Sequence, residues 1–280
     1  MRIKLTSDST CDLNKEQIAR FDIDILPLAV AMGGKDYRDG VDITPGDIYR
    51  HVNAGGGLPK TAAVNVAQYQ DVWAKYAKEY DAILHLNISA DFSSCHQNAR
   101  LAAEEFDNVY VIDSRNLSTG HGLLVMKAAE LAEQGVDAAE IARILQASVE
   151  KVDASFILDQ LEYLKKGGRC SSLAALGANL LKLKPCIEVQ NGKMAVGKKY
   201  RGAYEKCLKE YIQDRLKDRT DLDLSRVFVT HSGMDAALVQ LAVDTVNDLQ
   251  SFDELCITTA GCTISSHCGP GTLGVLFMKK

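Results

Sequence analysis

The stretch that most constrains the fold runs from Ala82 to Ala99, because it joins an apolar strand, a polar turn and the start of a helix. Its first half is of strand length, and from Phe92 onward the apolar residues recur at helical spacing. In an open α/β sheet such a turn lies at the carboxyl end of a strand, where ligands bind. Unpaired helix N–H groups favour an anion there, and Ser93 and Ser94 add hydroxyl donors. The competing interpretation is that Ser93 only caps the helix.

Strands alternate with helices up to residue 150, which predicts a doubly wound, mostly parallel sheet. Gly33-Gly34 predicts a hairpin turn, and Thr44-Pro45 predicts a helix start with threonine as the cap. Gly55 to Thr61 is predicted to be a flexible loop that presents Lys60 and Thr61. The other predicted elements are strands Ile3–Leu5, Ile23–Val30 and Val109–Ile112, and helices 14–21 (capped by Asp12), 65–78, 118–133 and 138–150.

The pattern changes after Val152, where a hairpin appears among helices. Asn191-Gly192 is a strong two-residue hairpin turn between 185–189 and 193–197. Ser171 to Leu181 reads as a small-residue helix. Further strands are predicted at 156–158, 226–230, 254–258 and 272–278, and helices at 203–217 and 236–249. We therefore predict an α/β protein with an N-terminal lobe, residues 1–152, and a C-terminal α+β lobe, residues 153–280.

Three predicted strands of the first lobe end in turns rich in Asp, Ser and Thr. These turns are Thr6–Thr10, Ser89–Ser94 and Asp113–Ser114. Because the carboxyl ends of parallel strands meet at one edge of a sheet, the three turns are expected to form the rim of a binding site.

Charge and hydropathy exclude several classes of partner. The net charge of −5 gives no general attraction to nucleic acid or to an anionic membrane. No apolar run approaches the roughly 18 residues that a membrane helix needs. The N-terminus has no apolar region typical of a signal peptide, so a cytoplasmic location is expected.

The motif search predicts no metal and no cofactor. The eight cysteines are scattered and form no CxxC pair, which indicates reduced thiols rather than a zinc site. Gly269 to Gly274 matches GxGxxG, but the chain ends six residues later without the helix that such a motif must open. P-loop, GxSxG and HExxH motifs are missing from the sequence.

Two adjacent Cys–His pairs raise the question of nucleophilic catalysis. In Cys95-His96 and His267-Cys268 the two side chains diverge if the segment is helical, so neither pair forms a dyad by itself. A pairing of Cys95 with His267 across the fold stays open. His267 is expected in a glycine-rich loop, which favours a functional role over the core role expected for His85.

Several motifs in order along the whole chain resemble the DegV family of bacterial fatty-acid-binding proteins. Any one of them is weak, but together they span the sequence. They are Thr6-Ser-Asp-Ser-Thr-Cys-Asp-Leu, Tyr37-Arg-Asp-Gly-Val-Asp-Ile-Thr-Pro, Pro59-Lys-Thr, Ile88-Ser-Ala-Asp-Phe-Ser, Val111-Ile-Asp-Ser-Arg, Leu161-Glu-Tyr-Leu-Lys-Lys-Gly-Gly-Arg, Lys184-Pro and His267-Cys-Gly-Pro-Gly-Thr-Leu-Gly.

This resemblance implies two lobes with one fatty acid held in a tunnel between them. It implies that Thr61 and Ser93 bind the carboxylate, and that Arg201 and His267 serve phosphorylation of that carboxylate by a partner kinase. We expect these last two residues to act at the partner interface more than in lipid binding. The sequence departs from the family at Ser93-Ser94-Cys95, where the family usually has Ser-Gly-Thr, and at His96, which replaces an aromatic residue.

The chemistry of these residues agrees with a non-catalytic carrier of a long-chain fatty acid. Thr61, Ser93 and the amides of the following helix can supply the donors that a carboxylate needs. Each buried methylene of an acyl chain adds about 0.8 kcal/mol to the binding free energy, so a long chain can supply most of the affinity. Leu26–Met32 and Leu173–Leu181 are the candidate tunnel walls. Two other hypotheses stay open: an acyl-ester hydrolase using Cys95 or Ser93 with His267, and a phosphate-substrate enzyme, because the family's first lobe resembles that of dihydroxyacetone kinases.

Overall fold

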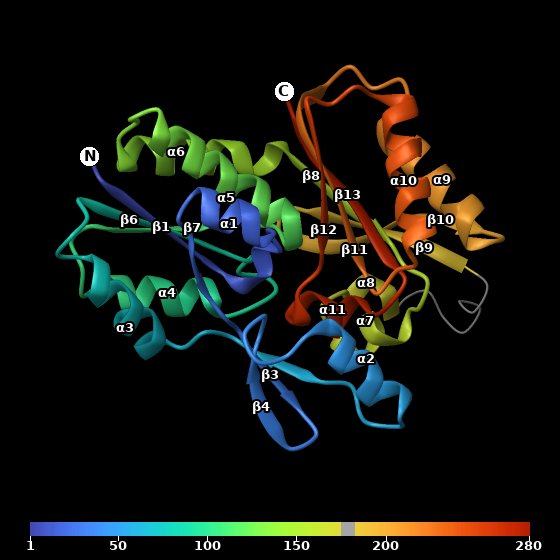
Figure 1. The fold of residues 1–280 in the computed structure, drawn as a ribbon, viewed down its shortest axis with the longest axis horizontal. Coiled ribbons are helices and arrows are strands. Elements are labelled where there is room, and N and C mark those ends of the chain that lie inside the picture. The colour runs from blue at the N-terminus through green and yellow to red at the C-terminus, as the bar shows by residue number, and fades with distance from the viewer. Residues whose placement is uncertain (175–182) are drawn as a thin grey trace.

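Two large β-sheets lie side by side, and a small third sheet projects from the region between them (Figure 1). The structure, a computed structural model, describes residues 1–174 and 183–280. The first large sheet belongs to the N-terminal part of the chain and the second to the C-terminal part, as predicted. The predicted boundary at 152/153 falls at the start of strand β8 and stays a prediction.

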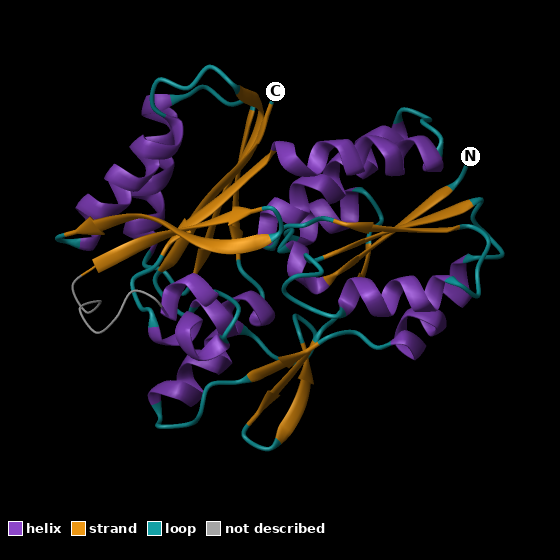
Figure 2. Cartoon of the chain, turned by 180° about the vertical axis from the view of Figure 1, so that it is seen from behind, coloured by secondary structure: helices purple, strands orange, loops and turns teal. Residues whose placement is uncertain are grey.

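The N-terminal sheet is entirely parallel, with the strand order β2-β1-β6-β7. In β6 the neighbours Ile83 and Leu84 belong to different cores, because successive side chains of a strand point to opposite faces. Helices α5 and α6 cover one face and α3 and α4 the other (Figures 1 and 2). The elements are β1 (Ile3–Asp8), β2 (Asp24–Leu26), β6 (Ala82–Asn87), β7 (Val109–Asp113), the 3-10 turn η1 (Ser9–Cys11), α1 (Lys15–Arg20), α3 (Val66–Tyr76), α4 (Cys95–Ala103), α5 (Ser118–Glu133), α6 (Ala138–Ser148) and η2 (Val149–Lys151).

The small antiparallel sheet has the order β4-β3-β5 and corrects two predictions. Its strands are β3 (Ala29–Met32), β4 (Lys35–Arg38) and β5 (Lys60–Ala62), and helix α2 (Pro45–Asn53) lies between β4 and β5 in the chain. The segment 23–30 is not one strand: it is divided between β2 and β3 around Pro27, which has no N–H to continue a ladder. The segment presenting Thr61 is a strand rather than a flexible loop, because β5 pairs with β3. The hairpin at Gly33-Gly34 and the Thr44 cap are confirmed.

The C-terminal sheet is mixed, with the strand order β10-β9-β8-β13-β11-β12. The predicted hairpin is confirmed, with Asn191-Gly192 joining β9 to β10. Helices α9 and α10 cover one face, and the other face turns toward the N-terminal part (Figure 2). The elements are β8 (Val152–Ile157), α7 (Glu162–Gly167), α8 (Ser171–Ala174), β9 (Leu183–Gln190), β10 (Lys193–Arg201), α9 (Tyr204–Leu216), β11 (Leu222–Ser232), α10 (Ala236–Leu249), β12 (Glu254–Thr259), α11 (Cys262–Cys268) and β13 (Thr272–Lys279).

Two further predictions are wrong, and a third lies partly outside the described residues. Helix α1 is capped by Asn14, which exchanges hydrogen bonds with Gln17, and not by Asp12. His267 lies in the last turn of α11, not in a loop, because the helix ends only at Gly269 with its positive φ. The helix predicted at Ser171–Leu181 begins as α8, and its remainder lies outside the described residues.

Two buried carboxylates of the N-terminal part hold the start of α11. Asp12 accepts the Gly261 N–H at 2.8 Å, and it also accepts the Ser118 hydroxyl. Asp39 accepts the N–H groups of Cys262 at 2.7 Å and Thr263 at 3.0 Å. These first-turn amides have no partners within their own helix, and a carboxylate is the acceptor that the positive end of the helix dipole favours. Helix α11 is therefore anchored to the other part of the protein.

Removing the Asp39 carboxylate should destabilise the protein. Asp39→Ala leaves two buried N–H groups without acceptors, at a cost of about 2–4 kcal/mol in the free energy of unfolding. Denaturant titration of the purified variant measures this loss. Asp36→Ala, at an exposed position of β4, is the matched control and should be within about 0.5 kcal/mol of wild type. Equal stability of the two variants would contradict the anchoring role.

Candidate ligand-binding site

A cavity of about 510 Å³ lies between the two parts of the chain. Its size is in the range of small-molecule sites. Most of its wall is apolar, and polar groups come from β5, the β6–α4 turn, the residues after α7, and α11. The lining residues are Leu28, Thr61, Ala62, Ala63, Ile88, Asp91, Phe92, Ser93, Ser94, Leu117, Arg169, Met194, Thr263, Ile264, His267 and Cys268.

The apolar wall continues inward beyond this cavity. A second, much smaller cavity of about 20 Å³ shares Leu117, Ile264 and Cys268 with the first. Leu28 is the member of the predicted lining segment Leu26–Met32 that reaches the cavity. For the other predicted segment, Leu173–Leu181, residues 175–181 lie outside the described residues, so that prediction stays a prediction.

Thr61 and His267 meet in the cavity wall. The Thr61 hydroxyl lies 2.8 Å from His267 Nε2, and the two residues come from the small sheet and from α11. Gly167, at the end of α7, packs on the other side of the imidazole, where an added Cβ would lie 2.5 Å from His267 Nδ1. A side chain at position 167 would therefore displace the ring from Thr61.

The surroundings of His267 indicate its protonation state. Burial and, to a smaller extent, the charge of Arg169 together lower its pKa from 6.5 to about 4. The imidazole is therefore neutral near pH 7. Nδ1 is buried and has no partner among residues 1–174 and 183–280, and a buried N–H without an acceptor is rarer than an unpaired acceptor. This favours the tautomer with the proton on Nε2, in which Thr61 accepts from His267 and keeps its own O–H for a ligand.

Ser93 lies at the start of α4 and also lines the cavity. Its hydroxyl accepts the Cys95 N–H at 3.3 Å and donates to Cys95 Sγ at 3.2 Å. The helix cap is Ser94, whose side chain makes no capping hydrogen bond. Ser93 therefore combines the two interpretations considered from the sequence, since it supports the first turn and is presented to the cavity.

Of the described lysines and arginines, the one that lines the cavity is Arg169, which the sequence analysis did not select. It is exposed and follows α7, and its guanidinium donates to its neighbour Gly167 O at 2.8 Å. Arg201 is the exposed last residue of β10, paired in register with Leu183, and is not among the lining residues. The signal for Arg169 was present in the motif Leu161–Arg169, but only the fold brings that motif to Thr61 and His267.

Only one of the three polar turns expected at the rim lines this cavity. That turn is Ser89–Ser94, which contributes Asp91, Ser93 and Ser94. The prediction of a turn at Thr6–Thr10 is partly wrong, because Thr6, Ser7 and Asp8 belong to β1. This segment is directed inward: the Asp8 carboxylate accepts the N–H groups of Thr10 at 3.0 Å and Ile88 at 2.8 Å.

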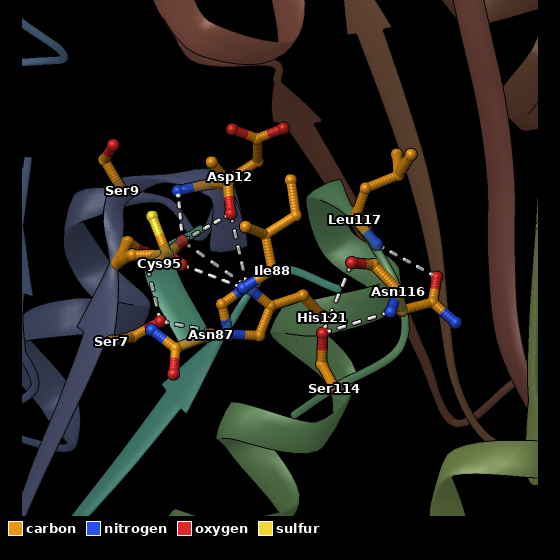
Figure 3. A network of polar contacts seen from close by, with 12 residues as sticks. Ser7, Ser9, Asp12, Asn87, Ile88, Cys95, Ser114, Asn116, Leu117 and His121 are labelled. Carbon is orange, nitrogen blue, oxygen red and sulfur yellow. Dashed lines mark hydrogen bonds and ion pairs between the residues drawn. The ribbon is translucent and has the colours of Figure 1, made fainter. Parts of the chain in front are cut away.

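The inward-facing turn belongs to a buried polar network (Figure 3). The Ser7 hydroxyl lies 3.2 Å from His121 Nε2, and both side chains are fully buried (Figure 3). His85 is also fully buried, between Thr6 and Asn87, which agrees with the core role expected for it. Apart from Asn87 Oδ1, which has no hydrogen-bond partner among the described residues, these polar groups pair with one another, so they stabilise the strand ends rather than offer donors to a ligand.

The tip of the β9–β10 hairpin closes one side of the cavity. Ser89 donates to Gly192 O at 2.8 Å, and Arg115 and Lys193 each lie 3.5 Å from the Asp91 carboxylate. Gly192 has a φ of +79°, and a Cβ there would lie 2.9 Å from the Ser89 hydroxyl. The hairpin therefore docks closely on the β6–α4 turn and brings Met194 into the wall.

The geometry gives no support to a cysteine nucleophile. Cys95 is buried, is not a lining residue, and burial raises the pKa of its thiol to about 12. In the described part of the chain no hydrogen bond joins Cys95 or Ser93 to His267, whose Nε2 faces Thr61. No cluster of three or more metal-binding side chains occurs among the described residues. Within the same residues, no helix is long and apolar enough to span a membrane.

The fold defines a two-part α/β protein with a cavity between its parts, and the lining of this cavity combines apolar side chains with hydroxyl, imidazole and guanidinium groups. A family model described as "Uncharacterised protein, DegV family" matches residues 2–280. The chain belongs to the DegV family.

Curated relatives and solved structures match this chain over all or nearly all of its length. A DegV domain-containing protein of Clostridium acetobutylicum is 34% identical, covering 100% of this chain and 99% of the relative. A Thermotoga maritima protein named fatty acid-binding protein is 31% identical, covering 98% and 96%. The structure of a DegV family protein from Thermus thermophilus, described by its fatty acid binding, has a TM-score of 0.91 at 31% identity, covering 100% of both chains. A stearic acid-binding protein from Eubacterium ventriosum has a TM-score of 0.83 at 27% identity, covering 99% and 98%.

The lowered pKa of His267 has a measurable consequence for stability. Between pH 6.5 and 4 the unfolded chain takes up a proton on this imidazole and the folded protein does not. The contribution of His267 to stability should therefore be complete above pH 6.5 and be lost as the pH falls through about 4. The ring titration followed by NMR should have its midpoint near pH 4, and His267→Gln should flatten the pH dependence of unfolding over the same range. A midpoint near 6.5 would contradict the burial of this ring.

Proposed function

We propose that this protein binds a long-chain fatty acid in the cavity between its two parts, with the carboxylate at Thr61 and Ser93. The observation that carries the proposal is the arrangement of the cavity, which places hydroxyl donors and a guanidinium beside a mostly apolar wall. An acyl chain matches the wall and a carboxylate matches the donors. The relatives named for fatty-acid binding add support.

The expected energetics favour this ligand over a small anion. Each buried methylene contributes about 0.8 kcal/mol, so the chain supplies most of the affinity and the carboxylate sets the orientation. Hydrogen bonds to a charged acceptor are worth about 1.5–3 kcal/mol each. Thr61 can donate while it accepts from His267, and Arg169 supplies a positive charge to the carboxylate.

We further propose that the protein presents this carboxylate to a partner, a fatty-acid kinase, and is not itself an enzyme. Arg169 and His267 mark the polar end of the cavity, and Arg201 lies exposed at the end of β10. A carboxylate held at this end would be near the protein surface, where a second protein can reach it. The acyl-ester hydrolase alternative needs an activated nucleophile, and the raised pKa of the buried Cys95 thiol does not favour it.

The first experiment is native mass spectrometry of the purified protein, followed by organic extraction of the bound lipid. The expected result is a stoichiometric adduct with the mass of a long-chain fatty acid. An empty protein that also fails to take up added palmitate or oleate would overturn the proposal.

The site assignment is tested with delipidated protein and titration calorimetry. Thr61→Val should weaken palmitate binding roughly tenfold, and Thr61→Val with Ser93→Ala roughly a hundredfold, because each variant removes a donor to a charged group. Ser225→Ala, at an exposed position of β11, is the control and should bind like wild type. Wild-type affinity in the double variant would show that the carboxylate is held elsewhere.

The proposed partner role predicts different effects for the substitution of two arginines, Arg201 and Arg169. Arg201→Ala should leave palmitate affinity within about twofold of wild type, because Arg201 does not line the cavity, and should lower kinase-dependent phosphorylation of the bound acid. Arg169→Ala should lower palmitate affinity itself, roughly tenfold. Measuring lipid affinity and phosphorylation separately in each variant distinguishes the roles. A loss of lipid affinity alone in Arg201→Ala would refute the partner assignment.

A further inference from the structure

Asp91 is the one acidic residue among the described residues that line the cavity, and it belongs to the same turn as Ser93. Only Phe92 separates the two, so their Cα atoms are at most about 7 Å apart. A fatty-acid carboxylate held at Ser93 would therefore lie near a second carboxylate, at a separation comparable with the Debye length of about 8 Å at physiological salt. Like charges at such distances repel each other. The proposed anionic ligand thus meets an unfavourable charge in the wall that should bind it.

Two cations from other segments compensate the charge of Asp91. Arg115 follows β7 and Lys193 begins β10, and each places a side-chain nitrogen 3.5 Å from the carboxylate, Arg115 at Oδ2 and Lys193 at Oδ1. Neither cation is among the described lining residues, so both act on Asp91 from outside the cavity. Lys193 belongs to the C-terminal part and Asp91 to the N-terminal part. The compensation is therefore complete only where the β9–β10 hairpin docks on the β6–α4 turn.

The charge balance of this cluster depends on both cations. Asp113, at the end of β7, is its second acid, and the carboxylate accepts the Arg115 N–H at 2.8 Å and the Ala90 N–H at 3.3 Å. The two carboxylates and the two cations sum to zero beside the cavity. Removing the Lys193 ammonium leaves one net negative charge there, and removing the Asp91 carboxylate leaves one net positive charge.

We propose that Arg115 and Lys193 shield the Asp91 carboxylate and so determine how tightly the cavity binds an anionic headgroup. This inference rests on the proposed function, because it takes the fatty-acid carboxylate to lie beside Asp91. The side chains of Arg115 and Lys193 are 42% and 71% exposed, and ion pairs this exposed stabilise a fold only slightly. Their effect on a charged ligand is therefore separable from any effect on folding.

Lys193 is the better residue to change, because Arg115 also donates to the Asn191 carbonyl at the hairpin tip. The test is calorimetric titration of delipidated protein with palmitate. Lys193→Gln should weaken binding roughly two- to fivefold, Asp91→Asn should strengthen it by a similar factor, and the double variant should return to wild-type affinity. The difference between Lys193→Gln and wild type should shrink in 1 M salt, where the Debye length is about 3 Å. Lys198→Gln removes an exposed cation of the same strand that pairs with a different acid, so this control should bind like wild type.

The sign of each effect decides the inference. Weaker binding in both single variants would mean that the pair of Asp91 and Lys193 only holds the hairpin in place, and unchanged binding in both would mean that the ligand does not sense these charges. A loss in Lys193→Gln that persists in 1 M salt, or that the double variant does not recover, would also refute the shield. All of these results leave the proposed function intact, because wild type binds palmitate in each. Failure of wild type to bind palmitate would refute the proposed function itself, and with it this inference.

Discussion

The site depends on one short helix, α11, whose first turn is held by the carboxyl side chains of Asp12 and Asp39. Asp12 and Asp39 belong to the N-terminal part, and together they accept the first three N–H groups at the start of α11. Burial raises the pKa of Asp12 to about 8, which shows how far this carboxyl is removed from water. Such a group is retained where its hydrogen bonds are needed, because an unpaired carboxyl at this depth would be strongly destabilising.

The position of α11, held in this way, determines where several polar and apolar residues of the cavity wall lie. Helix α11 carries His267 to the Thr61 hydroxyl, and its Ile264 and Cys268 form the apolar wall that continues into the smaller cavity. The polar groups of the site therefore come from segments far apart in the chain. Gly167 completes the arrangement, since a larger residue would push the imidazole away from Thr61. One helix thus contributes both polar and apolar side chains to the cavity wall.

Local signals predicted the elements well where the information lies within a few residues. Asn191-Gly192, Gly33-Gly34 and Thr44-Pro45 formed the predicted turns and helix start, because each depends on the φ preferences and caps of adjacent residues. The division of 23–30 around Pro27 was missed because the apolar run continues through it, and the resulting strands join two different sheets.

Residues with long-range partners were harder to place. Asp12 resembles a helix cap in sequence, but its partners are Ser118 and Gly261. Thr61 and Ser93 were selected by their motifs and do line the cavity, whereas Arg169, which also lines it, was not selected although it ends one of the motifs. A motif shows that an arginine is present but not which cavity its side chain reaches, and that depends on how α7 packs against α11.

The sequence by itself determined most of the order of strands and helices, with the exceptions of the division at Pro27, β5 and α11. It also determined the polar turn before α4 and the presence of hydroxyl, imidazole and guanidinium groups in recognisable motifs. These follow from periodicity, turn residues and caps, which act over a few residues. Only the tertiary structure decided which of these groups share a cavity and which form hydrogen bonds within the buried network around Asp8. The reason is physical: hydrogen-bond satisfaction and burial are properties of the packed interior, where partners 100 or more residues apart compete for the same donors and acceptors.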